Sequence, residues 1–385
     1  MREAAGRISE RREHASISPA FPVIRAAFAQ SIGKSNVVGP EFELDAAATA
    51  AGYDRVRTAS APAIDGPERS PMELSYADIE AAAERIAGRV RPVTIAPADQ
   101  PDDGSPQQWL ALEFLQHTGS FKARGAQNFL RAHREAGSMP ERGVTIASGG
   151  NAGMACAWAA RSQQVPATVF LPATAPPVKI DKLRGYGADV RLVGEQYADA
   201  LAACHAFAER SGALLSHAYD NPLIAAGAGT LLIEIHRQLP RLDTIVVAVG
   251  GGGLFAGIAT AAAHYGVRVV AAEPRDCRAL HAALAAGAPV DVAVDSVAAD
   301  ALGARRVTEL ALGAARASDS VPVLVSDEEI VATRRALWAE HRLAVEHAAA
   351  TAMAALTGGG YRPAPGERVC VVLCGANTDP GDLTR

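Results

Sequence analysis

Apolar residues over most of the chain occur in short runs separated by stretches with helical periodicity. Runs rich in Val, Ile, Leu and Ala predict eight strands. Their ranges are 144–147, 167–171, 189–193, 213–217, 244–249, 267–273, 321–325 and 368–374. Unbroken apolar runs are typical of strands buried on both faces, and the Ala-rich segments between them predict helices. The alternation predicts an α/β fold with mostly parallel twisted sheets, flanked by helices and joined by right-handed crossovers.

Residues 1–71 lack this pattern. They mix charged residues, Ser and Pro without a sustained period, apart from one short helical pattern at ELDAAATAAGY. A clear helical pattern begins directly after Met72, in ELSYADIEAAAERIAGRV. We therefore expect 1–71 to be a poorly ordered extension. Two origins stay open, a flexible tail or a natural translation start at Met72, and N-terminal sequencing of the native protein distinguishes them.

Composition and charge exclude several classes of protein. The chain has 385 residues, of which 49% are hydrophobic, enough for two domains with substantial cores. Its net charge of −5 and the absence of a basic run argue against a nucleic-acid partner. No apolar stretch approaches the roughly 20 residues that span a bilayer. Five scattered cysteines suggest neither a zinc site nor a disulfide framework, so we expect a reducing, cytoplasmic location.

The segment TIVVAVGGGGLFAGIATAAA joins a predicted strand to a predicted helix through four glycines, Gly250 to Gly253. A glycine turn at the start of a helix is a ready phosphate site. Gly251, Gly253 and Ala256 also fit a dinucleotide fingerprint, and Glu273 ends the next strand where an acidic residue contacts a ribose. From these residues alone a dinucleotide site, another phosphate site and a structural turn all stay open.

A lysine in an uncommon position forms the second candidate, within HTGSFKARGA. Gly119 and Ser120 are suited to end a loop and cap a helix that begins near Lys122. The helix dipole disfavours a positive charge in that first turn, which would lower the pKa of Lys122 and favour the neutral amine that imine formation needs. The alternative is a solvated surface lysine.

Two further loops follow predicted strands. Strand 144–147 runs into Ser148-Gly149-Gly150-Asn151-Ala152-Gly153, a second helix start with free backbone N–H groups, suited to a carboxylate. Asn151 either donates to a ring oxygen of a ligand or caps the helix. The last strand leads into Cys374-Gly375-Ala376-Asn377. No basic residue adjoins Cys374, so an activated thiolate is not supported, and a buried inert thiol is the main alternative.

Taken together, GSFKARGA, SGGNAGMA, VGGGGLFAGIA and CGAN occur in the order and at the spacing of one family. The chain resembles the fold type II pyridoxal-phosphate enzymes, which share the fold of the tryptophan synthase β subunit, and among them most closely the serine/threonine dehydratases, or ammonia-lyases. The resemblance covers about residues 73–385. It includes the stretches AARSQQVPATVFLPATAPPVKIDKLRGYGADVRLVG and SDEEIVATRRAL.

The resemblance implies roles for the residues of these motifs. Lys122 would form the imine with pyridoxal 5'-phosphate and act as the base, with Phe121 packed beside the ring. The phosphate would be held by Gly250, Gly251, Gly252, Gly253 and Leu254. Asn151 would donate to the ring oxygen O3′, and Cys374 would face the pyridine nitrogen. The substrate carboxylate would be held by Ser148, Gly149, Gly150, Asn151 and Ala152.

The resemblance also implies an architecture and a reaction. A small α/β domain of residues 116–221 would face a large cofactor-binding domain of residues 73–115 and 222–385, in a homodimer. The reaction would be β-elimination from L-threonine or L-serine, giving a 2-oxo acid and ammonia. A thiol facing the pyridine nitrogen would leave the ring unprotonated, which favours prompt loss of the leaving group. Serine, threonine and hydroxyaspartate are not ranked by the sequence.

The chain departs from its relatives at three places. Gly149 stands where serine racemases carry an acid/base serine, so we expect Cα epimerisation to be slow beside ammonia release. Glu273 matches one carboxylate of a divalent-metal pair, but Ala279 stands where the second is expected, which leaves a monovalent cation as the candidate ligand of Glu273. Glu346-His347 replaces a Glu-Pro pair, and His347 is either near the site or on a surface helix.

Three alternatives to a dehydratase remain at the level of the sequence. A threonine synthase-like lyase would share the lysine and the glycine loop. An NAD-dependent oxidoreductase would use the glycine loop alone. A non-catalytic protein would bind an amino acid or the cofactor without turning it over. Absorbance of the bound cofactor, its loss in Lys122→Ala, and ammonia release from serine and threonine separate these activities.

Overall fold

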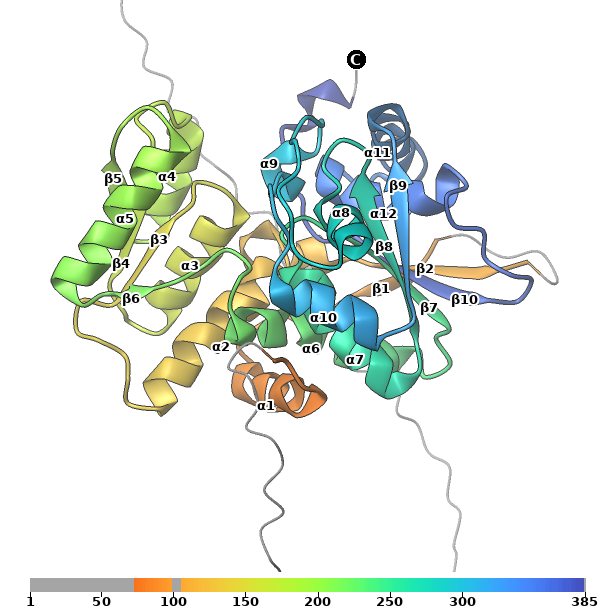
Figure 1. The fold of residues 1–385 in the computed structure, drawn as a ribbon, viewed down its shortest axis with the longest axis horizontal. Helices are drawn as coiled ribbons and strands as arrows, with labels where there is room; N and C mark the ends of the chain where they lie inside the picture. The colour runs from red at the N-terminus through yellow and green to blue at the C-terminus, as the bar shows by residue number, and fades with distance from the viewer. Residues whose placement is uncertain (1–72, 99–104, 384–385) are drawn as a thin grey trace, which may run out of the picture. The chain divides into compact units, whose positions relative to one another are not determined.

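The computed structural model describes residues 73–98 and 105–383, which belong to one compact unit. The expectations for 1–71, including the short helical pattern and the start at Met72, lie outside the described residues. Figure 1 shows the described part as two sheets with helices packed around each of them.

The smaller sheet is parallel and has the strand order β5-β4-β3-β6. The larger sheet has the order β1-β2-β10-β7-β8-β9 and is parallel except for the antiparallel pair β1–β2. The strands are β1 (Ile95–Pro97), β2 (Gln107–Ala111), β3 (Val144–Ala147), β4 (Ala167–Leu171), β5 (Asp189–Leu192), β6 (Leu214–Leu215), β7 (Thr244–Ala248), β8 (Arg268–Pro274), β9 (Ser320–Val325) and β10 (Arg368–Val372). The predicted fold class and all eight predicted strands are confirmed, whereas β1 and β2 were not predicted.

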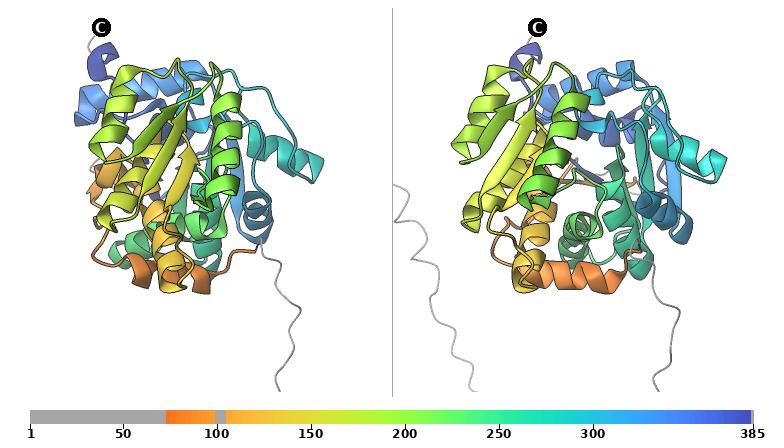
Figure 2. Two further views of the ribbon diagram at one scale, coloured as in Figure 1. Left: turned by 90° about the vertical axis from the view of Figure 1, so that its left-hand side faces the viewer. Right: turned by 60° about the vertical axis from the view of Figure 1, so that its left-hand side comes forward.

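Helices connect the strands and cover the sheets (Figures 1 and 2). They are α1 (Tyr76–Ile86), α2 (Lys122–Glu135), α3 (Asn151–Ser162), α4 (Pro177–Gly185), α5 (Tyr197–Ser211), α6 (Pro222–Gln238), α7 (Gly253–Tyr265), α8 (Ala279–Ala286), α9 (Ala299–Leu302), α10 (Glu309–Ala317), α11 (Asp327–His341) and α12 (His347–Thr357). Short 3-10 turns are η1 (Glu113–Leu115), η2 (His117–Gly119) and η3 (Pro380–Asp382).

Local sequence signals set several of the helix ends. The side chain of Asn221 accepts hydrogen bonds from the first N–H groups of α6, and a proline follows at the first helical position. Ser326 and Glu329 form a reciprocal capping box at the start of α11. Helix α5 ends at Gly212 in the left-handed conformation (φ 70°). These signals mark the helix ends in the local sequence.

Alternate residues of the smaller sheet enter two separate cores. Ile146 and Val169 pack in a core with residues of α2, α3 and α4, whereas Ala147 and Phe170 pack in another with Cys204 of α5. Successive side chains of a strand point to opposite faces, so helices must cover both faces of this sheet. All residues of β3, β4 and β7 are buried, as their unbroken apolar sequences predict.

The arrangement of the parallel strands brings the candidate motifs together. Strands β3 and β7 each lead at their carboxyl ends into a helix, α3 and α7, and β10 leads into the loop containing Cys374. Helix α2, which begins at Lys122, packs against both α3 and α6. Ligands of α/β proteins bind at such strand ends, so the fold places the motifs where a ligand site is expected.

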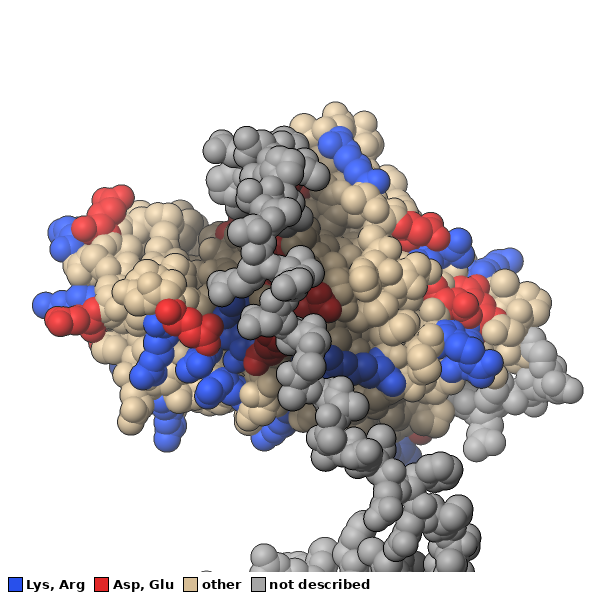
Figure 3. Space-filling view, turned by 90° about the horizontal axis from the view of Figure 1, so that it is seen from below, with Lys and Arg blue, Asp and Glu red and all other residues tan. Residues whose placement is uncertain are grey.

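The exposed surface carries both signs of charge. On the face drawn in Figure 3, basic and acidic side chains are interspersed where the described residues are visible. Among the described helices, none is long and apolar enough to cross a membrane. All five cysteines are free and buried.

Candidate active site

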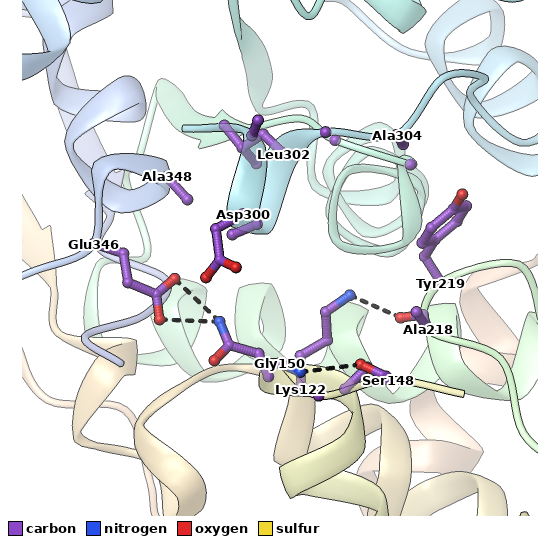
Figure 4. A pocket seen from close by; sticks show the side chains of 18 of the residues that line it. Lys122, Ser148, Gly150, Ala218, Tyr219, Asp300, Leu302, Ala304, Glu346 and Ala348 are labelled. Carbon is purple, nitrogen blue, oxygen red and sulfur yellow. Dashed lines mark hydrogen bonds between the residues drawn. The ribbon is translucent and has the colours of Figure 1, made fainter. Parts of the chain in front are cut away.

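One cavity of about 600 Å³ gathers nearly all the residues that the sequence singled out. Its lining includes Phe121, Lys122, Ser148, Gly149, Gly150, Asn151, Ala152, Gly250, Gly251, Gly252, Gly253, Leu254 and Cys374. Figure 4 shows side chains from several elements pointing into this cavity, among them Lys122, Asp300 and Glu346. Glu273 is the one predicted site residue that does not line it.

Lys122 is the first residue of α2, as the sequence predicts. Its Nζ donates a hydrogen bond to the carbonyl oxygen of Ala218 at 2.7 Å and lies 4.8 Å from the centre of the Phe121 ring. Burial lowers the pKa of Lys122 to about 8, against an opposing effect of nearby Cys374 and Glu346. The predicted direction of the shift is therefore present, but burial rather than the helix dipole is its leading cause.

The predicted capping role of Ser120 is wrong. The N-cap residue of α2 is Phe121, which makes no side-chain capping hydrogen bond. The Ser120 hydroxyl is buried and has no hydrogen-bond partner among the described residues. The chain is instead held before the helix by backbone contacts, because Phe121 donates its N–H to the carbonyl of Cys374 and Ser120 pairs with Gly375 in an isolated bridge.

A buried ion cluster anchors the helix that carries Lys122. The guanidinium of Arg124 donates to both carboxylate oxygens of Glu113, at 2.6 and 3.1 Å, and to both of Glu234, at 2.7 and 3.0 Å. Arg124 and Glu113 are fully buried, so removing one partner would leave an uncompensated charge. The cluster ties α2 to α6 and η1, and so fixes the helix end at which Lys122 stands.

The four glycines form a cup with no room for side chains. Gly252 has a φ of +96°, in the left-handed region that favours glycine. A Cβ on Gly252 would overlap the Cβ of Ala311, and one on Gly251 would overlap the ring of Tyr219. A Cβ on Gly250 would lie 3.0 Å from the Cα of Leu302. The backbone N–H groups at the start of α7 are thus left bare toward the cavity, which suits a phosphate.

The loop before α3 presents a second helix start. Gly150 is the N-cap residue, and no side chain caps the helix. The proposal that Asn151 caps α3 is therefore wrong. Its Nδ2 instead donates to both carboxylate oxygens of Glu346, each at 3.0 Å, and its Oδ1 accepts from Nδ2 of Asn377 at 2.8 Å.

Glu346 is a site residue that the sequence did not identify. It is 7% exposed, lines the cavity, and accepts a further hydrogen bond from the backbone N–H of Asn377 at 2.7 Å. Burial raises the pKa of this carboxyl, although the bonds from Asn151 and Asn377 oppose the shift. The only sequence signal was its place in the Glu346-His347 pair. His347 begins α12 and does not line the cavity.

Cys374 lines the cavity as a buried thiol. Burial raises its pKa to about 12, and the negative charge of Glu346 acts in the same direction. The thiol is therefore protonated at neutral pH and is not an activated nucleophile.

Glu273 is engaged away from the cavity. It lies in β8, is fully buried, and accepts from the backbone N–H groups of Leu280 at 2.7 Å and His281 at 2.8 Å. Its carboxylate thus caps the start of α8, and burial raises its pKa to about 7. No group of three or more His, Cys, Asp or Glu side chains in the described chain is arranged to hold a metal ion. A cation at Glu273 stays a prediction.

An ion pair joins two helices that line the cavity. Nζ of Lys179 in α4 lies 2.9 Å from Oδ1 of Asp300 in α9, and both residues line the cavity. Both side chains remain partly solvated, so the pair contributes little to stability. No motif in the sequence pointed to it, because the partners are separated by 121 residues.

The fold and the site together define an enzyme of the pyridoxal-phosphate class. A buried lysine of lowered pKa, a glycine cup and an asparagine loop meet at the carboxyl ends of parallel strands. The chain belongs to the family of pyridoxal-phosphate dependent enzymes, whose family model matches residues 86–375. This membership overturns the dinucleotide interpretation of the glycine run.

Individual relatives agree with this assignment. The chain is 38% identical over 311 residues to an L-threonine ammonia-lyase of Geobacter sulfurreducens, covering 80% of this chain and 76% of the relative. It is 36% identical over 276 residues to a phenylserine dehydratase of Ralstonia pickettii, covering 71% and 84%. The solved structure of a T.th. threonine deaminase matches with a TM-score of 0.72 and 30% identity, over 79% of this chain and 99% of that one.

Proposed function

We propose that the protein is a pyridoxal-phosphate dependent ammonia-lyase that converts L-threonine or L-serine into a 2-oxo acid and ammonia. The observation that carries this proposal is the meeting of Lys122, the glycine cup and the Asn151 loop in one cavity. The names of the relatives, L-threonine ammonia-lyase and phenylserine dehydratase, support the same reaction class.

The residues present fit the cofactor. Gly251 and Gly252 are packed too closely against Tyr219 and Ala311 to carry side chains, and the glycine run leaves its backbone N–H groups for the phosphate. Asn151 would donate to the ring oxygen, Phe121 would pack beside the ring and Cys374 would face the ring nitrogen. When bound, the cofactor supplies an electron sink for the charge that develops at Cα.

The chain's own groups would hold the substrate and move its protons. The N–H groups of the loop from Ser148 to Ala152 would bind the substrate carboxylate at the start of α3. The amine of Lys122, with its pKa near 8, would take the Cα proton, because at neutral pH it exchanges protons readily.

Lys122 is also the proposed donor of the proton with which the β-hydroxyl leaves as water. Cys374 is too weak an acid for this step, since its pKa is about 12. The released enamine takes up one water and hydrolyses to the 2-oxo acid and ammonia. The net reaction converts threonine to 2-oxobutanoate, or serine to pyruvate, with ammonia as the other product.

We further propose the two-domain division expected from the sequence, with residues 116–221 against residues 73–115 and 222–385. The smaller sheet falls within the first range and the larger sheet within the second set, which supports this division. A homodimer and a cytoplasmic location complete the proposal. The five free, buried cysteines are compatible with a reducing compartment, and sedimentation equilibrium tests the dimer.

A substrate screen tests the proposed reaction. The cofactor-saturated protein is incubated with L-serine, L-threonine, phenylserine and 3-hydroxyaspartate, and ammonia and the 2-oxo acid are measured. We expect equal amounts of both products from serine or threonine and none with Lys122→Ala. Bound cofactor without product from any of the four would contradict the proposal and indicate a binding protein. Formation of threonine from a phosphorylated homoserine would indicate a threonine synthase instead.

A further inference from the structure

Glu346 occupies a position that its own helix does not explain. It is the N-cap residue of α12, yet its side chain accepts no hydrogen bond from the N–H groups of that helix. The carboxylate turns instead toward the cavity wall, where it contacts the amide of Asn151 and the N–H of Asn377. This buried carboxylate therefore accepts hydrogen bonds from other segments and none from its own helix.

The hydrogen bonds around Glu346 form one connected set, in which each group is bonded to another member. Nδ2 of Asn377 donates to the carbonyl oxygen of Thr118 at 2.6 Å and to Oδ1 of Asn151 at 2.8 Å. Nδ2 of Asn151 donates to Glu346, and Glu346 accepts from the backbone of Asn377. The set therefore links the start of α3, the start of α12, the C-terminal loop and the segment four residues before Lys122.

Only one orientation of the Asn151 amide satisfies this set. The carbonyl of Thr118 can only accept, so Asn377 must turn its NH₂ group toward it and toward Oδ1 of Asn151. An ionised carboxylate also only accepts, so Asn151 must turn its NH₂ group toward Glu346. The carbonyl of Thr118 and the carboxylate of Glu346, at the two ends of this series of hydrogen bonds, therefore fix the orientation of both amides.

Two glycines make room for the set. A Cβ on Gly375 would lie 2.8 Å from Oε2 of Glu346, and one on Gly119 would lie 3.0 Å from Oδ1 of Asn377. Gly119 also has a φ of +73°. Side chains at either position would push the carboxylate or the amide away, so the backbone here is shaped around these two groups.

We propose that Glu346 is a positioning residue whose carboxylate holds the amide of Asn151 so that one of its N–H groups faces the ring oxygen of the cofactor. The amide nitrogen of Asn151 carries two hydrogens, and among the described residues Glu346 is its one hydrogen-bond acceptor. The inference rests on the proposed function, which assigns the ring-oxygen contact to Asn151. Glu346 acts through Asn151 and needs no contact with the substrate.

A double-mutant cycle on cofactor affinity tests this role. The variants are Glu346→Ala, Asn151→Ala and the combination, each titrated with pyridoxal 5'-phosphate, with the bound-cofactor absorbance recorded. Loss of one ligand hydrogen bond weakens binding by about tenfold. We expect each single variant to lose about that factor and the double variant to lose about the same tenfold, because the two residues act as one unit. All three should share one shifted absorbance maximum.

Glu367 provides a matched control. Its carboxylate likewise accepts three hydrogen bonds, from Thr244, Tyr361 and the N–H of Ala364, but it does not line the cavity. Glu367→Gln should lower the melting temperature of the cofactor-free protein and leave cofactor affinity and absorbance unchanged. If Glu346→Ala behaves like this control, or if the losses multiply to about a hundredfold in the double variant, Glu346 does not position Asn151.

A conservative variant covers the case in which Glu346→Ala does not fold. Glu346→Gln keeps the size and one acceptor oxygen, so we expect a smaller loss of affinity, about two- to fivefold, that vanishes when Asn151 is already alanine. A loss that persists in the Asn151→Ala background overturns the proposal. Cofactor affinity can be read whether or not ammonia is released. A wild-type protein that binds cofactor without turnover would therefore refute the proposed function and leave this test standing.

Discussion

The starts of α7 and α8 follow neighbouring parallel strands of one sheet, but only one of them faces the cavity. At α7 the chain supplies four glycines, and the N–H groups are left bare toward Lys122 and the rest of the site. At α8 the carboxylate of Glu273 accepts from the N–H groups of Leu280 and His281. A helix start becomes a ligand site when the protein leaves it without an acceptor of its own.

The comparison explains why Glu273 was a misleading signal. An acidic residue at the end of the strand after a glycine run fits a ribose contact or a cation ligand equally well by sequence. In the structure both of its oxygens are engaged by the helix that follows. An acidic residue in this position often marks a ligand site. Here the carboxylate of Glu273 itself occupies the helix start that a ligand would bind.

The largest expected effect comes from removing the amine of Lys122, which lines the same cavity as the glycine cup. Lys122→Ala should abolish the bound-cofactor absorbance band and lower ammonia release by about 10²–10⁴-fold or more, because it removes the proposed general base. Absorbance and coupled 2-oxo acid assays measure both. Lys182→Ala, on the exposed face of α4, is the control and should keep wild-type activity. Retention of activity in Lys122→Ala would remove the lysine from the mechanism.

The pH dependence of cofactor capture reports the pKa of Lys122. The pKa is lowered to about 8, so the amine loses its proton above that pH and is protonated below it. The rate of cofactor capture by the cofactor-free protein should rise about tenfold per pH unit below 8 and level off above it. Stopped-flow absorbance measures the profile. A rate that still rises at pH 10 would indicate an ordinary, solvated lysine.

Gly252→Ala should damage the cup itself. The residue would be forced into the left-handed region and against Ala311, which costs about 1–3 kcal/mol of unfolding free energy and would displace the proposed phosphate contacts. Gly150→Ala is the matched variant at the start of α3, where an added Cβ meets nothing within 4 Å. Its free energy of unfolding should change by about 0.5 kcal/mol or less. Equal losses in the two variants, measured by urea unfolding, would show that the cup is not specially constrained.

Glu273→Ala should destabilise the protein without affecting the cofactor. Losing the acceptor for the buried N–H group of Leu280 and the partly buried one of His281 costs about 1–3 kcal/mol. The carboxyl has its pKa raised from 4.5 to about 7, so the stability it contributes is present at low pH and is lost as the pH rises through that interval. The difference between wild type and variant in urea unfolding should therefore shrink from pH 5 to pH 8. A loss of cofactor affinity or of potassium-dependent activity would instead support a cation site.

The smallest expected effect concerns Gly149. Wild-type protein should release ammonia from serine faster than it epimerises Cα, because Gly149 offers no second acid/base. Gly149→Ser should raise epimerisation only a few-fold, since its Cβ would lie 2.9 Å from a methyl group of Leu171, which must move. Chiral analysis of the remaining serine measures both. Racemate that forms faster than ammonia in the wild type would contradict the assignment.

Local sequence patterns were sufficient to predict the parts of the fold that depend on neighbouring residues in the chain. The buried strands, the glycine cup and the place of Lys122 at a helix start all follow from periodicity and turn chemistry. Strands β1 and β2 escaped prediction because only Leu110 and Ala111 in them are buried, so neither strand has an unbroken apolar sequence. Pairing of β2 with β10, more than 250 residues later in the chain, completes that side of the sheet.

The parts of the site that depend on distant contacts could not be foreseen. Glu346 meets Asn151 across 195 residues, and no periodicity records that contact. Ser120 looked like a cap because its type and position fit one, yet backbone pairing with the C-terminal loop holds the segment instead. Motifs identify the groups that a ligand touches, whereas the groups that orient them are set by tertiary packing.

The most direct test of the account is the site of covalent attachment of the cofactor. Protein saturated with pyridoxal 5'-phosphate is reduced with borohydride, digested and mapped by mass spectrometry. We expect one modified peptide, carrying the reduced cofactor on Lys122, and none when serine or threonine is in excess during reduction. Attachment at another lysine, or no attachment in a protein that still releases ammonia from threonine, would contradict it.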